Sequence, residues 1–279
     1  MKDLLNEYYG LKIEYSREYQ QGLIFFVNGD YYYLCKTYLT IDDINISYDL
    51  YLLLKRRGIV LHDFIFNKEN KLLSNGYVLL KLNYLIDKID LRDLQRTNIK
   101  VDFDIKDDFY QLWVDKIDYY EEKLFVDEDN GYVCYSFDYF IGISELLLNF
   151  YKDNKIGLDS NYIVHRSFIT LSTIDYYNPL NIVVGDKWKD YSSYIRLTND
   201  WQLLYDILNV VNQEEKSYLF VRLAFPFRYF YYINMLLYDK ANSKVLLNIV
   251  DEIDLYEKYL IKLEEFVGIK MFYWIKKDN

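Results

Sequence analysis

The sequence predicts an α+β protein with a small antiparallel sheet near its N-terminus and a larger, mainly helical region after it. Up to Asn83, short β-rich runs alternate with turns that contain Gly and Asn, which is typical of hairpins. After Asn83, apolar residues recur at helical spacing over long segments. We therefore expect two lobes, at residues 1–83 and 84–279, with no low-complexity linker between them.

The first lobe is expected to hold two helices and two hairpins. Asp3–Tyr9 has a short amphipathic pattern, and the pair Asn28-Gly29 between two β-rich runs favours a type I′ turn, because both residues tolerate positive φ. Ile41–Arg57 is apolar on one face, and Gly58 is placed to end that helix. The expected strands are Leu23–Val27, Tyr31–Leu34, Val60–Asn67 and Gly76–Leu82.

The second lobe is predicted to be mainly helical. The region Ile163–Val184 is mixed, with a β-rich run at Ile182–Val184. Thr198 and Asn199 are candidates for the N-cap of the helix that follows them. The expected helices are Asp107–Tyr120, Phe137–Tyr151, Trp201–Val211, Tyr218–Tyr238 around Pro226, and Lys244–Val267.

Composition and charge exclude several classes of partner. The hydrophobic fraction of 52% is that of a folded globular chain. The formal net charge of -10 disfavours nucleic acid and anionic membranes, because both repel an acidic surface. Two Cys and two His, without metal-ligand spacing, argue against a metal site built from them. The first residues lack the apolar core of a signal peptide, so we expect the protein to be cytoplasmic when synthesised.

Three stretches follow one another in the second half of the chain. They are FDYFIGISE from Phe137, then VHRS from Val164 with YNPLNIVVGD from Tyr177, and RLAFPFRYF from Arg222. In this order they resemble the spore-coat-associated branch of the aminoglycoside phosphotransferase and choline kinase superfamily. The resemblance implies a protein-kinase-like two-lobe fold. It also implies a role in building the spore coat or in attaching to it.

The resemblance aligns the catalytic loop of active relatives with His165-Arg166-Ser167. In those relatives the loop reads His-Gly-Asp, and an Asn that helps bind a metal follows the Asp by about five residues. Ser167 stands at the Asp position, and a serine hydroxyl is not ionised near neutral pH, so it cannot act as that base. The Asn position falls near Ser172, a poor ligand, and Asp175 is displaced from it.

The resemblance also assigns residues to ATP and Mg²⁺, the cofactors of active relatives. Lys36 would hold the nucleotide phosphates, although a solvated lysine on an exposed strand is an equal interpretation, and Asp49 is the nearest candidate for its carboxylate partner. Asp186 follows the β-rich run and would bind the nucleotide-bound metal, with helix capping as an equal interpretation. Asp190 would brace the loop or cap a helix, and His165 would be a structural residue of the loop.

Taken together, these residues predict a catalytically impaired kinase-like protein, a pseudokinase without catalytic residues, that acts as a protein-binding scaffold. A glycine-rich phosphate loop is also missing, since only Gly22 precedes Leu23. The expected partners are other coat or scaffold proteins, or a second copy in a homodimer, with deposition on the spore coat. Two alternatives stay open: an active small-molecule kinase with Asp175 as base and Asp186 on Mg²⁺, and a switch that binds nucleotide without hydrolysing it.

Overall fold

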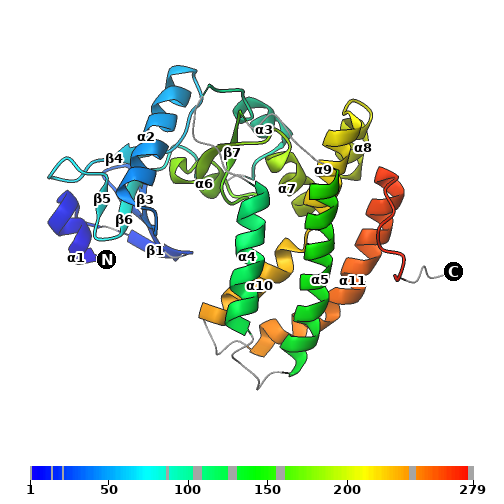
Figure 1. Cartoon of the computed structure of the whole chain (residues 1–279). Helices are drawn as coiled ribbons and strands as arrows, with labels where there is room; N and C mark the ends of the chain where they lie inside the picture. Colours follow the sequence, from blue (N-terminus) through cyan, green and yellow to red (C-terminus); the bar gives the residue numbers. More distant parts are fainter. Residues whose placement is uncertain are drawn as a thin grey trace. The chain divides into compact units, whose positions relative to one another are not determined.

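The computed structural model describes residues 2–13, 15–20, 22–85, 88–102, 109–124, 131–154, 161–238 and 243–275. They form two compact units (Figure 1). The first unit comprises residues 1–106 and 160–190, and the second comprises residues 107–159 and 191–279. The first unit carries the sheet and the loop with the candidate site residues, and the second unit is helical.

The boundary expected after Asn83 lies inside the first unit. The reason is that residues 88–102 bond to the segment that holds the candidate loop. Val101 N donates to Asn161 O at 2.7 Å, and Ile89 N donates to Leu171 O at 2.9 Å. The loop is therefore tied by backbone hydrogen bonds to the same compact unit as the N-terminal sheet.

The main sheet of the first unit is antiparallel, as predicted. Its order is β1-β2-β3-β6-β4, and β5 pairs with β6. The turn at Asn28-Gly29 is confirmed, with φ values of 51° and 88° between the paired strands β2 and β3. The strands are β1 (Tyr15–Tyr19), β2 (Gly22–Val27), β3 (Asp30–Lys36), β4 (Asp63–Ile65), β5 (Leu73–Ser74) and β6 (Tyr77–Lys81); a separate pair is β7 (Tyr162–His165) and β8 (Ile182–Gly185).

Local capping sets the bounds of the principal helix of this unit, α2. The Thr40 side chain accepts from Asp43 N, the Asp43 side chain accepts from Thr40 N, and Gly58 follows the helix with φ 78°. The helical elements of the first unit are α1 (Lys2–Leu4), the π-helical turn η1 (Leu5–Tyr9), α2 (Ile41–Arg56), α3 (Leu91–Thr97), α6 (Thr173–Tyr176) and the 3₁₀ turn η2 (Pro179–Asn181).

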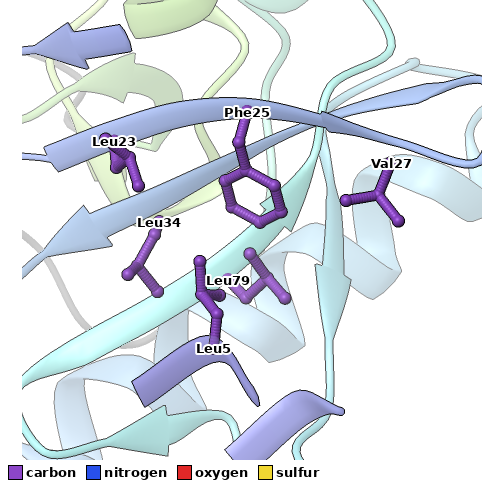
Figure 2. Packing of buried hydrophobic residues seen from close by; sticks show 6 residues of the cluster. All are labelled: Leu5, Leu23, Phe25, Val27, Leu34 and Leu79. Atoms are coloured by element: carbon purple, nitrogen blue, oxygen red, sulfur yellow. The ribbon is translucent and has the colours of Figure 1, made fainter. Parts of the chain in front are cut away.

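A buried cluster joins the N-terminal turn to the sheet. Figure 2 shows Leu5 of η1 packed against side chains of β2, β3 and β6. Phe25, Leu34 and Leu79 in this cluster are fully buried, so the apolar residues of alternate strand positions supply the stabilising contact. The N-terminal segment is thereby fixed to the strands that lead into the candidate site.

Gly22 begins β2 at a position where the structure has no room for a side chain. A Cβ atom there would lie 2.3 Å from Leu34 O and 2.6 Å from the Tyr33 ring. We expect Gly22→Ala to lower the free energy of unfolding by about 1–3 kcal/mol, because the backbone must shift. Gly142→Ala is the matched control in an open position of a helix, and it should be neutral or stabilising by up to about 1 kcal/mol. Urea unfolding of both variants checks this, and equal effects would contradict it.

The second unit is built from helices, two of which differ from the prediction. The single helix expected around Pro226 is two helices, because Phe225 before the proline is extended at ψ 132°. The N-cap of the helix at Trp201 is Asp200, which accepts from Leu203 N, and not Thr198 or Asn199. The helices are α4 (Phe109–Leu124), α5 (Gly131–Asp153), α7 (Lys189–Thr198, beginning in the first unit), α8 (Trp201–Leu208), α9 (Gln213–Ala224), α10 (Phe227–Tyr238) and α11 (Ser243–Val267).

Aromatic side chains form much of the core of this second unit. Tyr120 stacks on Phe230 with ring centroids 5.1 Å apart, and Phe140 stacks on Tyr229 at 4.0 Å. Many of the tyrosines are therefore core residues rather than surface residues. None of the described helices is both long enough and apolar enough to cross a membrane. The predicted helix start at Asp107 lies outside the described residues.

Candidate functional site

The pairing of β7 with β8 closes the candidate loop, residues 166–181. His165 is opposite Ile182 in this pair, so the two ends of the loop lie side by side. Ser167 N donates to Asn181 Oδ1 at 2.8 Å, and Asn181 Nδ2 donates to Ser167 O at 2.5 Å. The amide of Asn181 thus clasps the backbone of Ser167, and the exposed Ser167 side chain is left facing outward.

His165 and Asp190 form a buried pair beneath this loop, and each side chain is only 1% exposed. The Asp190 carboxylate accepts from His165 N at 3.0 Å and contacts His165 Nδ1 at 2.6 Å. His165 Nε2 lies 2.7 Å from Tyr176 O. Because both ring nitrogens are occupied, His165 is a positioning residue of the loop and offers no nitrogen to a ligand. Asp190 is the second residue of α7, and its carboxylate braces the loop instead of capping the helix.

Asp175 joins the loop to the turn between β1 and β2. Its carboxylate accepts from Thr170 Oγ1 at 2.6 Å, from Tyr19 OH at 3.0 Å and from Gln20 Nε2 at 3.0 Å. Burial raises the pKa of the Tyr19 hydroxyl to about 12, so Tyr19 remains a donor at neutral pH. Three donors, from the loop and from the β1–β2 turn, therefore hold the Asp175 carboxylate in place.

A cavity of about 560 Å³ lies within the first unit, beside this loop. The end of β3 and the residues before α2 form one wall, and the loop forms the other. Ser167 lies at this cavity together with the cations Lys36 and Arg166. The further lining residues are Gln20, Cys35, Thr37, Tyr38, Leu39, His165, Phe168, Ile169, Thr170, Asp175, Tyr176, Asn178, Leu180 and Asn181.

The residues predicted to bind cofactors are not all gathered at the cavity. Lys36 lines it, and its Nζ lies 5.2 Å from the ring centroid of Tyr38. Asp49 is exposed on α2, and no ion pair joins it to Lys36 in the described part of the chain. Asp186 is 6% exposed at the end of β8, where its Oδ1 accepts from Trp188 N at 3.1 Å, and it does not line the cavity.

The donor set does not fit a magnesium site of the kinase type. Mg²⁺ takes oxygen ligands, and phosphoryl transfer needs at least two of them from the protein at one place. Among the described residues, no three acidic, His or Cys side chains are grouped so that they could hold a metal ion. Asp175 is the one carboxylate among the described residues that line the cavity, and its oxygens accept from Thr170, Tyr19 and Gln20. We therefore derive no step that passes through a bound metal.

Tyrosines also fasten the sheet to the loop. Tyr19 packs edge-on against the buried ring of Tyr33, with centroids 5.7 Å apart, and its hydroxyl oxygen lies 2.9 Å from Ser172 Oγ. Tyr84, after β6, stacks on Tyr177 of the loop at 4.3 Å. Tyrosine side chains from β1 and from the segment after β6 thus contact the loop directly.

The sequence missed Asn181 as a residue of this site. Counting from Ser167 placed the Asn position near Ser172, but Ser172 is the N-cap of α6 and accepts from Ile174 N. The loop is longer than that count assumes, so the residue that meets Ser167 comes directly before β8. The position of Asn181 just ahead of the β-rich run Ile182–Val184 was the signal that could have identified it.

The fold is similar to those of solved phosphotransferases. An aminoglycoside phosphotransferase from Alicyclobacillus acidocaldarius has 14% identity and a TM-score of 0.61, over 92% of this chain and 93% of that one. A choline kinase from Streptococcus pneumoniae has 12% identity and a TM-score of 0.59, over 96% and 98%. A spectinomycin phosphotransferase, solved with ADP and spectinomycin, has 15% identity and a TM-score of 0.56, over 96% of each chain.

These similarities confirm the predicted α+β, protein-kinase-like fold. No protein-family model matches the chain, and no curated protein matches it. The spore-coat branch and the loss of catalysis stay predictions.

Proposed function

We propose that this protein is a kinase-like protein that does not transfer phosphoryl groups and that acts by binding other proteins. The observation that carries the proposal is the residue at the position of the catalytic Asp in the loop. Ser167 stands where the resemblance expects the catalytic Asp, and its backbone is held by the side-chain amide of Asn181. A hydroxyl side chain supplies neither the base nor the negative charge of that position.

The active-kinase alternative needs Asp175 as the base. Asp175 lies at the cavity, which favours that reading, but three donors hold its carboxylate. Releasing it would break the contacts to Tyr19 and Gln20 at the β1–β2 turn. Asp186, the acid proposed for Mg²⁺, is buried and bonded to the backbone of Trp188. Of the two acids, Asp175 lines the cavity and Asp186 does not, and this supports a non-catalytic role.

Within this proposal, the partners are other coat or scaffold proteins, and the protein is deposited on the spore coat after synthesis in the cytoplasm. The support is the resemblance of the three sequence stretches in the second half of the chain. In a sporulating host, a tagged chain is expected to fractionate with the coat. Recovery only in the soluble fraction of the mother cell would contradict that part of the proposal.

The test of catalysis is a transfer assay with Mg-ATP and hydroxylated acceptors: aminoglycosides, choline and sugars. We expect phosphorylated product at the level of a protein-free control. Ser167→Asp should also stay at that level, because it restores the base position without supplying metal ligands. Turnover by the unmodified chain that is lost in Asp175→Asn or in Asp186→Ala would overturn the proposal in favour of an active kinase.

The nucleotide-switch alternative rests on Lys36, which lines the cavity. Thermal unfolding with and without Mg-ATP separates it from the proposal, since a ligand at a hundredfold excess over Kd stabilises the native state by about 2.7 kcal/mol. We expect no magnesium-dependent shift in Tm. A shift that Lys36→Ala removes, in the absence of turnover, would identify the switch.

A further inference from the structure

The polar groups on the floor of the cavity bond to one another and leave little for a ligand to bind. His165 uses both ring nitrogens, Asp175 accepts from three donors, and Asn181 uses both ends of its amide. Asn178 Oδ1 accepts from Leu180 N at 3.0 Å. The hydrogen-bonding groups of these lining residues are therefore already bonded within the protein. A ligand would have to bind to other lining residues of the cavity.

The available groups are donors and cations. Lys36, at the end of β3, and Arg166, in the loop, are exposed, line the cavity, and form no ion pair within the part of the chain that the structure describes. Asp43 interacts electrostatically with Arg166, but its carboxylate already accepts from Thr40 N and Thr40 Oγ1. In a chain with a net charge of -10, two such cations at one cavity make a local site for negative charge.

Exposed apolar side chains lie at the same cavity. Tyr38 is 78% exposed and Ile169 is 50% exposed, and each belongs to a different wall. Apolar side chains close to cations favour a ligand that carries both apolar and anionic groups. A small anion alone would leave the apolar area of the cavity in contact with water.

We infer that this cavity docks an acidic peptide segment of a partner protein, with an apolar side chain against Tyr38 and Ile169 and carboxylates at Lys36 and Arg166. The inference rests on the proposed function, and it specifies the kind of protein segment that would bind in this cavity. Lys36 belongs to β3 and Arg166 to the loop, so acids on both sides of the apolar residue give the segment one carboxylate for each cation. The charge complementarity selects an acidic segment over a basic or neutral one.

The test is binding of an array of short peptides with a central Trp, Phe, Leu or Ile. The flanking residues are acidic in one set, Asn and Gln in a second, and Lys and Arg in a third. We expect the full chain to retain the acidic set preferentially and to lose affinity as NaCl is raised from low to physiological concentration. Lys36→Glu/Arg166→Glu should weaken the acidic set at least about tenfold, because two attractive contacts become repulsive.

The matched control is Lys12→Glu/Lys270→Glu, which reverses two exposed lysines that are not among the lining residues of the cavity and changes the net charge equally. It should bind the acidic set like the unmodified chain. Tyr38→Ser/Ile169→Ser should weaken binding and keep the preference for acidic flanks. All three variants change exposed residues, and circular dichroism should show an unchanged fold.

Three results would overturn the inference. The first is an array without preference for acidic flanks, and the second is equal weakening by the cavity variant and the control. The third is ATP or inorganic phosphate binding that Lys36→Glu/Arg166→Glu abolishes while no peptide binds, which would identify a phosphate ligand. The transfer assay is independent of these results, so phosphoryl transfer would defeat the proposed function, whereas a failed array without transfer defeats this inference alone.

Discussion

Replacing Asp190 by Ala should lower the free energy of unfolding by about 3–5 kcal/mol, one of the largest effects expected in this protein. The variant leaves His165 buried with its Nδ1 and its backbone N–H without their acceptor. Both side chains are only 1% exposed, so bulk water does not reach the two donors. Urea unfolding followed by circular dichroism measures the loss.

The matched control for this change is Asp206→Ala. Asp206 is exposed on α8 and accepts only from Gln202 among the described hydrogen bonds, so its removal should change stability by no more than about 0.5 kcal/mol. The double variant His165→Ala/Asp190→Ala should cost less than the sum of the single variants, because the two residues contact each other. A change of under 1 kcal/mol in Asp190→Ala would contradict the bracing role.

Acidification should destabilise the protein through His62, which is fully buried before β4. Burial lowers the pKa of His62 to about 4, from 6.5 in the unfolded chain. Asn83 N donates to His62 Nδ1 at 3.1 Å, so the neutral ring carries its proton on Nε2, and no partner is in bonding geometry there. Protonation of His62 Nδ1 would place its N–H against the backbone N–H of Asn83, so two donors would face each other.

The direction of the pH effect follows from this lowered pKa. As the pH falls below 6.5, His62 becomes protonated in the unfolded chain, whereas in the folded chain it stays neutral until about pH 4. The free energy of unfolding therefore decreases between pH 6.5 and about pH 4. The contribution of His62 approaches about 3 kcal/mol. Unfolding in urea at several pH values should show a steeper decline in the unmodified chain than in His62→Gln. Parallel curves for the two proteins would exclude this role for His62.

Neither prediction depends on catalysis, and both concern the unit that holds the cavity. His62 N donates to Tyr177 O at 3.0 Å, so the strand before β4 and the candidate loop share a backbone bond. Loss of His165–Asp190 or protonation of His62 should therefore loosen the loop. Variants made to test binding at the cavity should be assayed near neutral pH, where His62 is neutral.

Local chemistry made parts of this structure predictable from the sequence. The turn at Asn28-Gly29 was found because both residues tolerate positive φ. The bounds of α2 follow from Thr40 at its start and Gly58 after its end. The resemblance at His165-Arg166-Ser167 predicts that Ser167 replaces the catalytic Asp, and this stays a prediction. Each of these signals lies within a few residues of the feature that it predicts.

The arrangement of the site depended on contacts between distant residues. Asp190 meets His165 across 25 positions, and Gln20 meets Asp175 across 155. Asn181 reaches Ser167 only because β7 pairs with β8, and counting along the chain gave Ser172 instead. The sequence predicted the fold class and most of the elements, and by resemblance it placed Ser167 at the position of the catalytic Asp. The tertiary structure alone decided which side chains are engaged and which stay available, because strand pairing and burial bring together residues that no local pattern relates.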